Sequence, residues 1–135
     1  MQLILLSAGK GSRLPKKLRS KPKSLAKVND KPIIEHNVKF FNKFKKKIIV
    51  TGYKQKSLSS FAKKYNFKII HNNKYQNTNM VYSMFLPSRY ITSDVVICYG
   101  DIIFDHKIYN LLNNKNNIIP LNINWLKIWK KRMSK

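Results

Sequence analysis

Four short runs of mainly apolar residues are spaced along the chain at residues 3–6, 47–52, 67–70 and 94–99. Within each run the apolar residues are close to continuous and do not alternate with polar ones. Such runs are typical of strands buried on both faces, which occur in parallel sheets. The pattern therefore predicts a mostly parallel sheet built from four strands.

Between these runs, apolar residues recur at helical spacing. Residues 32–44 carry such a stripe, a second follows over 58–65, and a third over 80–86 ends near Pro87. Strands that alternate with helices predict right-handed crossovers, with helices on both faces and ligands beyond the carboxyl ends of the strands. The expected fold is α/β, a Rossmann-like three-layer α/β/α arrangement.

The end of the chain is expected to be less regular. Residues 106–112 are typical of a helix and 113–117 of an Asn-rich loop, and 118–121 are expected to form an edge strand because Pro120 cannot donate to a ladder. The apolar stripe in residues 125–133 needs a surface to cover it, so self-association is a further expectation. With no linker or repeat visible, residues 1–135 are expected to form a single domain.

The chain is strongly basic, with 28 Lys and Arg against 5 Asp and Glu and a formal net charge of +23. A balance of this kind usually indicates a nucleic-acid or anionic-membrane partner. Here the basic residues are scattered and lack the recurring aromatic and glycine pattern of an RNA-binding sheet. We therefore favour solvated basic faces over a nucleic-acid partner.

Cys98 is the single cysteine and lies inside the fourth apolar run. It cannot form an internal disulfide and is expected to be a small buried hydrophobe. The first apolar run is too short for a signal-peptide core, and no stretch is long enough to span a membrane. These features predict a soluble cytoplasmic protein.

A glycine-containing loop follows the first strand. Gly9 and Gly11 allow backbone conformations closed to other residues and leave room for a phosphate near the amides. Successive N–H groups in such a turn form an anion-binding concavity, and Lys10, Arg13 and Lys23 can add charge-assisted hydrogen bonds. The loop therefore predicts a polyphosphate site.

Two better-known glycine loops do not fit. The Walker pattern requires Gly-Lys followed by Ser or Thr, but Gly11 follows Lys10. The dinucleotide fingerprint requires a third glycine at position 14, where this chain has Leu14. It also requires an acidic residue further along the chain, and none stands at the expected distance.

The remaining pattern is Leu-x-Ala-Gly-x-Gly-x-Arg-Leu over 6–14, followed by Pro22-Lys23-x-Leu25 and by Lys-Pro-Ile-Ile-Glu-His over 31–36. This combination resembles the nucleotidyltransferases that join an NTP to a phosphorylated small molecule and release pyrophosphate. The resemblance implies that Arg13 holds the departing pyrophosphate and that Lys23 contacts the α-phosphate or the acceptor phosphate. It also implies a set of nucleotide-binding residues in the loop: Leu6, Ala8, Gly9, Lys10, Gly11 and Ser12.

A second segment narrows the resemblance. Thr78, Asn79 and Ser83 form a Thr-Asn-x-x-x-Ser pattern similar to one that phosphocholine cytidylyltransferase-like members carry beside the nucleotide. It implies that these three residues bind nucleotide and that Asn79 reaches base or ribose. Capping of the helix over 80–86 by Thr78 or Asn79 is an equally good explanation of the same residues.

Gly100 and Asp101 follow the fourth strand, at the edge where the glycine loop is expected. Gly100 is assigned to the nucleotide site and Asp101 to Mg²⁺, because magnesium accepts one or two carboxylates together with waters and phosphate oxygens. A strand-end turn aspartate is the alternative. Asp105 is a poor candidate for a second ligand because it lies several residues past the strand.

The function implied is transfer of CMP from CTP to phosphocholine or a related phosphorylated acceptor. A sugar-1-phosphate nucleotidyltransferase using another NTP, and a non-catalytic basic remnant that binds nucleotide or nucleic acid, remain as alternatives. Relatives of this kind continue past residue 135, and the segment before Trp125 reads Asn-Ile-Asn where they usually carry aspartates. The resemblance thus implies an N-terminal, NTP-binding part of a nucleotide-diphospho-sugar transferase type of fold, with the acceptor-binding part missing.

Overall fold

The computed structural model describes residues 1–16, 19–113 and 117–133. The chain divides into two compact units, Met1–Phe104 and Asp105–Lys135, which are considered separately below. The first unit contains the sheet and every residue assigned to the nucleotide site. A single domain over the whole chain stays a prediction.

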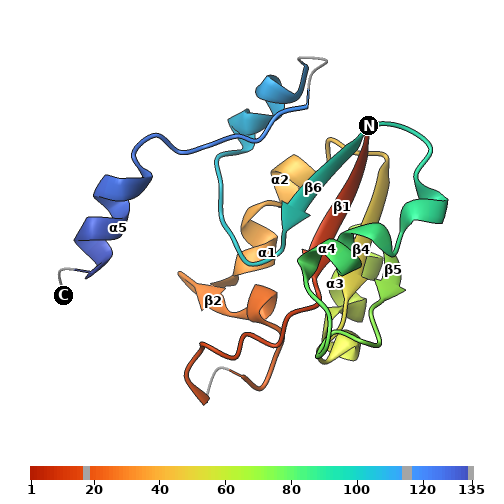
Figure 1. Cartoon of the computed structure of the whole chain (residues 1–135), viewed down its shortest axis with the longest axis horizontal. Helices are drawn as coiled ribbons and strands as arrows, with labels where there is room; N and C mark the ends of the chain where they lie inside the picture. The colour runs from red at the N-terminus through yellow and green to blue at the C-terminus, as the bar shows by residue number, and fades with distance from the viewer. Residues whose placement is uncertain (17–18, 114–116, 134–135) are drawn as a thin grey trace. The chain divides into compact units, whose positions relative to one another are not determined.

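The first unit is built on a four-stranded parallel sheet (Figure 1). Its strands are β1 (Gln2–Ser7), β4 (Lys46–Thr51), β5 (Lys68–His71) and β6 (Val95–Tyr99), in the order β5-β4-β1-β6. All six residues of β1 are buried, as expected for the central position. The parallel sheet predicted from the four apolar runs is confirmed, with strand ends that differ by no more than one residue.

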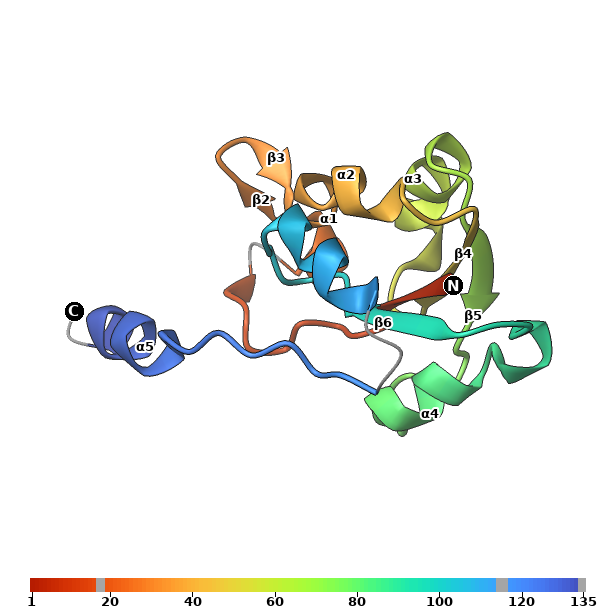
Figure 2. The same ribbon diagram turned by 90° about the horizontal axis from the view of Figure 1, so that it is seen from above.

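Helices cover both faces of this sheet, which confirms the three-layer α/β/α arrangement. In Figure 2 one face carries α1 (Ile33–His36), α2 (Val38–Phe41) and α3 (Ser59–Lys64), and the other face carries α4 (Met80–Phe85). Alternate residues of a strand point to opposite faces. Ile4 and Leu6 accordingly pack with Val50 against Met84 on the α4 side.

The helix expected over 32–44 is interrupted. Two short helices, α1 (Ile33–His36) and α2 (Val38–Phe41), are separated by Asn37, whose φ of −96° and ψ of 7° are not helical. The buried Asn37 amide donates to the Ile102 carbonyl at 2.7 Å and accepts from the Phe104 amide at 3.3 Å. The prediction of one helix is wrong because Asn37 anchors the chain that follows β6.

A two-residue turn precedes these helices. Strands β2 (Lys27–Val28) and β3 (Lys31–Pro32) pair antiparallel around Asn29 and Asp30, whose φ angles are +48° and +58°. Positive φ at both central residues is the geometry of a tight hairpin turn. Pro32 ends β3 and does not begin a helix, unlike the helix expected over 32–44.

The other elements of the first unit are short. A 3₁₀ helix over Gln55–Leu58 leads into α3 (Ser59–Lys64), as the stripe over 58–65 predicts. Further 3₁₀ turns occupy Lys23–Leu25 and Ser88–Tyr90.

The second unit contains a 3₁₀ helix over His106–Asn113 and the helix α5 (Trp125–Met133). The edge strand expected over 118–121 does not form: these residues are irregular, and Ile119 and Leu121 are more than 80% exposed. A strand needs a neighbouring ladder, and the described residues supply none here. The loop expected over 113–117 falls mostly outside the described residues. Among the helices described, none combines the length and apolar character needed to cross a membrane.

Candidate nucleotide-binding site

The segments that follow the four parallel strands meet at one edge of the sheet. Hydrogen bonds continue past the strand ends, from the Gly100 amide to the Leu6 carbonyl at 2.9 Å and from the Tyr53 amide to the Ala8 carbonyl at 3.0 Å. The glycine loop is therefore held between the chain after β4 and the chain after β6. This is the edge where open α/β sheets bind their ligands.

The glycine loop turns sharply at Gly11, whose φ is +68°. The Leu14 amide donates to the Gly11 carbonyl, which closes the turn, and a Cβ at Gly11 would lie 3.1 Å from the Lys23 Cβ. At Gly9, by contrast, an added Cβ would meet no described atom within 4 Å. The loop therefore packs against Lys23 at one glycine and opens to solvent at the other.

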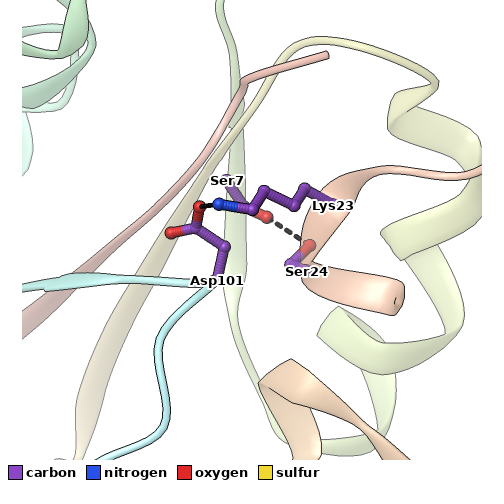
Figure 3. A network of polar contacts seen from close by, with 4 residues as sticks. All are labelled: Ser7, Lys23, Ser24 and Asp101. Carbon is purple, nitrogen blue, oxygen red and sulfur yellow. Dashed lines mark hydrogen bonds and ion pairs between the residues drawn. The ribbon is translucent and has the colours of Figure 1, made fainter. Parts of the chain in front are cut away.

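Lys23 and Asp101 point toward each other at this edge (Figure 3). The Lys23 Nζ donates to the Asp101 Oδ2 at 2.6 Å, and the two side chains are 39% and 31% exposed. Both charges can therefore be reached from solvent while they neutralise each other.

A buried hydrogen bond fixes the backbone beside this ion pair. The Ser7 hydroxyl, at the end of β1, donates to the Ser24 hydroxyl at 2.6 Å (Figure 3). A Cβ at Gly100 would lie 3.0 Å from the Ser7 Oγ and 3.3 Å from the Ser24 Cβ. Gly100 is thus packed against this pair, and the absence of its side chain lets the chain after β6 approach the segment that carries Lys23. Sequence reasoning missed Ser7 and Ser24.

Asp101 is the carboxylate that fits a metal at this edge. Its side chain is partly exposed, and no group of three or more His, Cys, Asp or Glu side chains suited to a metal is found among the described residues. A single carboxylate suits Mg²⁺ that takes its other ligands from phosphate and water. Asp105 is highly exposed in the second unit and accepts a hydrogen bond from the Lys107 amide.

The segment after β5 forms a loop over 72–79 that is closed by internal hydrogen bonds. The Thr78 hydroxyl donates to the Lys74 carbonyl at 2.8 Å, and the buried Ser83 lies beneath the loop. The Asn79 Oδ1 accepts from the Tyr82 amide at 3.1 Å, so Asn79 caps α4 as expected. The nucleotide-binding roles of Thr78, Asn79 and Ser83 stay predictions. Sequence reasoning missed Asn72, which connects this loop to Ser83.

Two further residues hold the glycine loop. Gly52 lies so close to the loop that an added Cβ would be 2.7 Å from the Ala8 carbonyl oxygen and 2.6 Å from the Tyr75 Cβ. The Tyr53 hydroxyl donates to the Arg19 carbonyl at 2.8 Å. A glycine directly after a buried strand was the one signal in the sequence that could have drawn attention to this contact.

The structure thus brings Gly11, Lys23, Gly100 and Asp101 together. The remaining loop side chains, Lys10, Ser12 and Arg13, are exposed around the same turn. Their roles toward phosphate stay predictions, because none of them contacts Lys23 or Asp101 among the hydrogen bonds and ion pairs described.

Comparison with known proteins decides the family. The family model described as MobA-like NTP transferase domain matches residues 3–116. The chain belongs to this family. Its parallel sheet and glycine loop are therefore parts of an NTP transferase domain of this family.

Individual relatives of this chain include cytidylyltransferases. It is 31% identical over 112 residues to the choline-phosphate cytidylyltransferase of Streptococcus pneumoniae, and the match covers 82% of this chain and 49% of that protein. It is 30% identical over 145 residues to the CTP:phosphoglutamine cytidylyltransferase of Campylobacter jejuni, and the match covers 99% of this chain and 57% of that protein. A solved structure of the CTP:phosphocholine cytidylyltransferase from Streptococcus pneumoniae superposes with a TM-score of 0.67 at 31% identity, covering 74% of this chain and 44% of that one. The chain spans about half the length of these relatives.

Proposed function

We propose that this chain binds CTP as part of a cytidylyltransferase that transfers CMP to a phosphorylated small molecule such as phosphocholine and releases pyrophosphate. One observation carries the proposal: a glycine loop, a lysine and a carboxylate converge at the carboxyl edge of β1 and β6, with the Lys23 Nζ 2.6 Å from the Asp101 Oδ2. The cytidylyltransferase relatives support CTP as the nucleotide.

In the proposed reaction, an oxygen of the acceptor phosphate attacks the α-phosphorus of CTP. The new P–O bond forms as the bond between the α-phosphorus and the bridging oxygen to the β-phosphate breaks, and pyrophosphate leaves with that electron pair. The amides around Gly9 and Gly11 hold the phosphates, and Arg13 contacts the departing pyrophosphate. Lys23 contacts the α-phosphate or the acceptor phosphate, so positioning and charge stabilisation supply the catalysis.

Asp101 would hold Mg²⁺ in this site. The ion supplies positive charge to the phosphate oxygens, which lowers the repulsion between CTP and the acceptor. Its fit rests on a partly exposed carboxylate beside a phosphate-binding loop. Lys23 keeps this carboxylate in place before nucleotide binds.

Nucleotide binding by this chain tests the proposal. Isothermal titration calorimetry with CTP, UTP, ATP and GTP, each with Mg²⁺ and with EDTA, should show Mg²⁺-dependent binding with a preference for CTP. A preference for UTP or another NTP would instead favour a sugar-1-phosphate nucleotidyltransferase. Binding that is lost steeply with salt and shows no preference for CTP with Mg²⁺ would indicate a non-catalytic polyanion-binding protein.

Product formation tests the second half of the proposal. The chain is incubated with CTP, Mg²⁺ and phosphocholine, and CDP-choline is quantified by chromatography, with phosphoglutamine and glucose-1-phosphate as competing acceptors. We expect CDP-choline to accumulate. Transfer to glucose-1-phosphate in preference to phosphocholine would contradict the proposed acceptor.

A further inference from the structure

The loop over 72–79 and the residue after it run across the carboxyl edge of the sheet. Within the loop, Tyr75 packs on Gly52, beside the Ala8 carbonyl of the glycine loop. Just after the loop, the Met80 sulfur contacts the hydroxyl of Tyr99, the residue before Gly100. Asn79 therefore lies on a segment that is anchored beside the glycine loop and beside Gly100.

Asn72 is the buried centre of this loop. It is 1% exposed, and its own amide continues the sheet ladder by donating to the Thr51 carbonyl at 2.7 Å. Its side-chain Nδ2 donates to the Thr78 hydroxyl at 2.9 Å and to the Ser83 hydroxyl at 3.0 Å. Its Oδ1 accepts from the Lys74 amide at 2.9 Å. One side chain thus connects the start of the loop, its end and α4.

The direction of these hydrogen bonds is fixed by chemistry. A backbone amide can only donate, so the atom of Asn72 that faces the Lys74 amide must be the oxygen. The other atom is the NH₂ group, whose two protons go to Thr78 and Ser83. Both hydroxyls then donate onward, Thr78 to the Lys74 carbonyl and Ser83 to the Asn79 carbonyl at 3.4 Å. Asn72 therefore determines which group donates and which accepts in each hydrogen bond of the network.

This network leaves Asn79 directed outward. Its Oδ1 is occupied by the cap of α4, and the residue is exposed. The group that it offers to solvent is therefore the side-chain NH₂, a pair of donors. Donors of this kind suit the carbonyl and ring-nitrogen acceptors of a pyrimidine base, or the oxygens of a ribose.

We propose that Asn72 is a positioning residue for nucleotide binding. It holds the loop over 73–79 against the end of the sheet so that the Asn79 side-chain NH₂ meets the base or ribose. This inference rests on the proposed function, because it takes the ligand at this edge to be a nucleotide.

The variant Asn72→Asp tests the inference. It keeps the shape of the side chain and the acceptor for the Lys74 amide, but it removes both donors to Thr78 and Ser83. Asn73→Asp is the matched control, since Asn73 is exposed and makes no hydrogen bond in the network while the same negative charge is added one residue away. Calorimetry with CTP and Mg²⁺ should show about tenfold weaker binding for Asn72→Asp than for Asn73→Asp.

Hydrogen exchange in the nucleotide-free protein provides a readout that does not depend on the ligand. The Asn77 amide donates to the Lys74 carbonyl inside the loop. Its exchange should be faster in Asn72→Asp than in Asn73→Asp. Should Asn72→Asp fail to fold, Ser83→Ala removes one arm of the network at a residue that is 4% exposed. It should also weaken CTP binding.

Equal CTP affinity in Asn72→Asp and Asn73→Asp, or an unchanged affinity in a folded Ser83→Ala, would overturn the inference. Failure of the proposed function looks different, because the wild-type chain would then bind no CTP. In that case faster exchange at Asn77 would reduce Asn72 to a purely structural residue.

Discussion

The Lys23 ammonium and the Asp101 carboxylate form an ion pair with a separation of 2.6 Å, across 78 positions of sequence. Each of these groups is the proposed partner of something else, Lys23 of a phosphate and Asp101 of Mg²⁺. Before ligand binds, they satisfy each other. A nucleotide that arrives with Mg²⁺ offers both groups a new partner of opposite charge at once, so the pair keeps the site neutral and ordered until then.

Replacing Lys23 with Ala should weaken binding of CTP with Mg²⁺ by about 1.5–3 kcal/mol, the usual contribution of a hydrogen bond to a charged group. Stability should change by less than about 1 kcal/mol, because the ion pair is partly exposed. Calorimetry measures the first quantity and urea denaturation the second. Lys21→Ala is the control, as it removes the same charge from an exposed residue two positions earlier. Equal affinities in the two variants would make Lys23 an ordinary surface lysine.

Asp101→Asn should abolish the Mg²⁺-dependent part of nucleotide binding and leave the fold intact, because the amide has no charge to offer the metal. The measurement is the rise in melting temperature on adding CTP with Mg²⁺, compared with CTP in EDTA. Asp105→Asn should keep the full rise, since Asp105 is exposed and already accepts from the Lys107 amide. A full Mg²⁺-dependent rise in Asp101→Asn would rule out this metal assignment.

The sheet was predictable because each of its strands contains a nearly continuous apolar run, and the two inner strands, β1 and β4, are largely buried. The glycine loop and Asp101 were predictable because they follow directly after such strands, so their place at one edge comes from the parallel topology. Asn37 and Asn72 were not predictable: each is a buried amide whose partners are backbone or side-chain groups brought close by the fold. In sequence, a buried asparagine cannot be told from one in a surface turn.

Partners that are distant in sequence also explain the two wrong predictions outside the site, the single helix over 32–44 and the edge strand over 118–121. Asn37 occupies a position in a stripe with helical spacing, yet its bonds to residues 102 and 104 compete with the helix. Residues 118–121 have the composition of an edge strand, but an edge strand forms only beside a neighbour. Propensity and spacing describe what a segment can do locally, and these two cases depend on what lies next to it.

Cys98 should make stability fall with pH between about 9 and 12. Burial raises the pKa of its thiol from the ordinary value of 9.0 to about 12. Below pH 9 the thiol is protonated in both states. Above pH 9 the unfolded chain ionises while the folded chain does not, which favours unfolding. The free energy of unfolding, measured in urea at pH 8 and pH 10, should drop by about 1 kcal/mol more in the wild type than in Cys98→Ala. Equal drops would show that Cys98 ionises freely in the folded state.

Substitution by alanine should lower stability at Gly52 and leave it nearly unchanged at Gly9. At Gly52 the new Cβ would lie 2.7 Å from the Ala8 carbonyl oxygen and 2.6 Å from the Tyr75 Cβ, so the backbone must shift. Gly52→Ala should therefore lower stability by about 1–3 kcal/mol. At Gly9 the Cβ meets no described atom within 4 Å, and stability should stay within about 0.5 kcal/mol of wild type.

The open space at Gly9 is where the proposed phosphates approach the backbone, so Gly9→Ala should instead weaken CTP binding. Urea denaturation and calorimetry on both variants separate the two effects. If Gly9→Ala binds CTP as tightly as the wild type, the phosphates do not approach the backbone at Gly9. The phosphate-binding site must then lie nearer to Gly11 and Lys23. If Gly52→Ala keeps full stability, the contact between the glycine loop and the chain after β4 is looser than the structure describes.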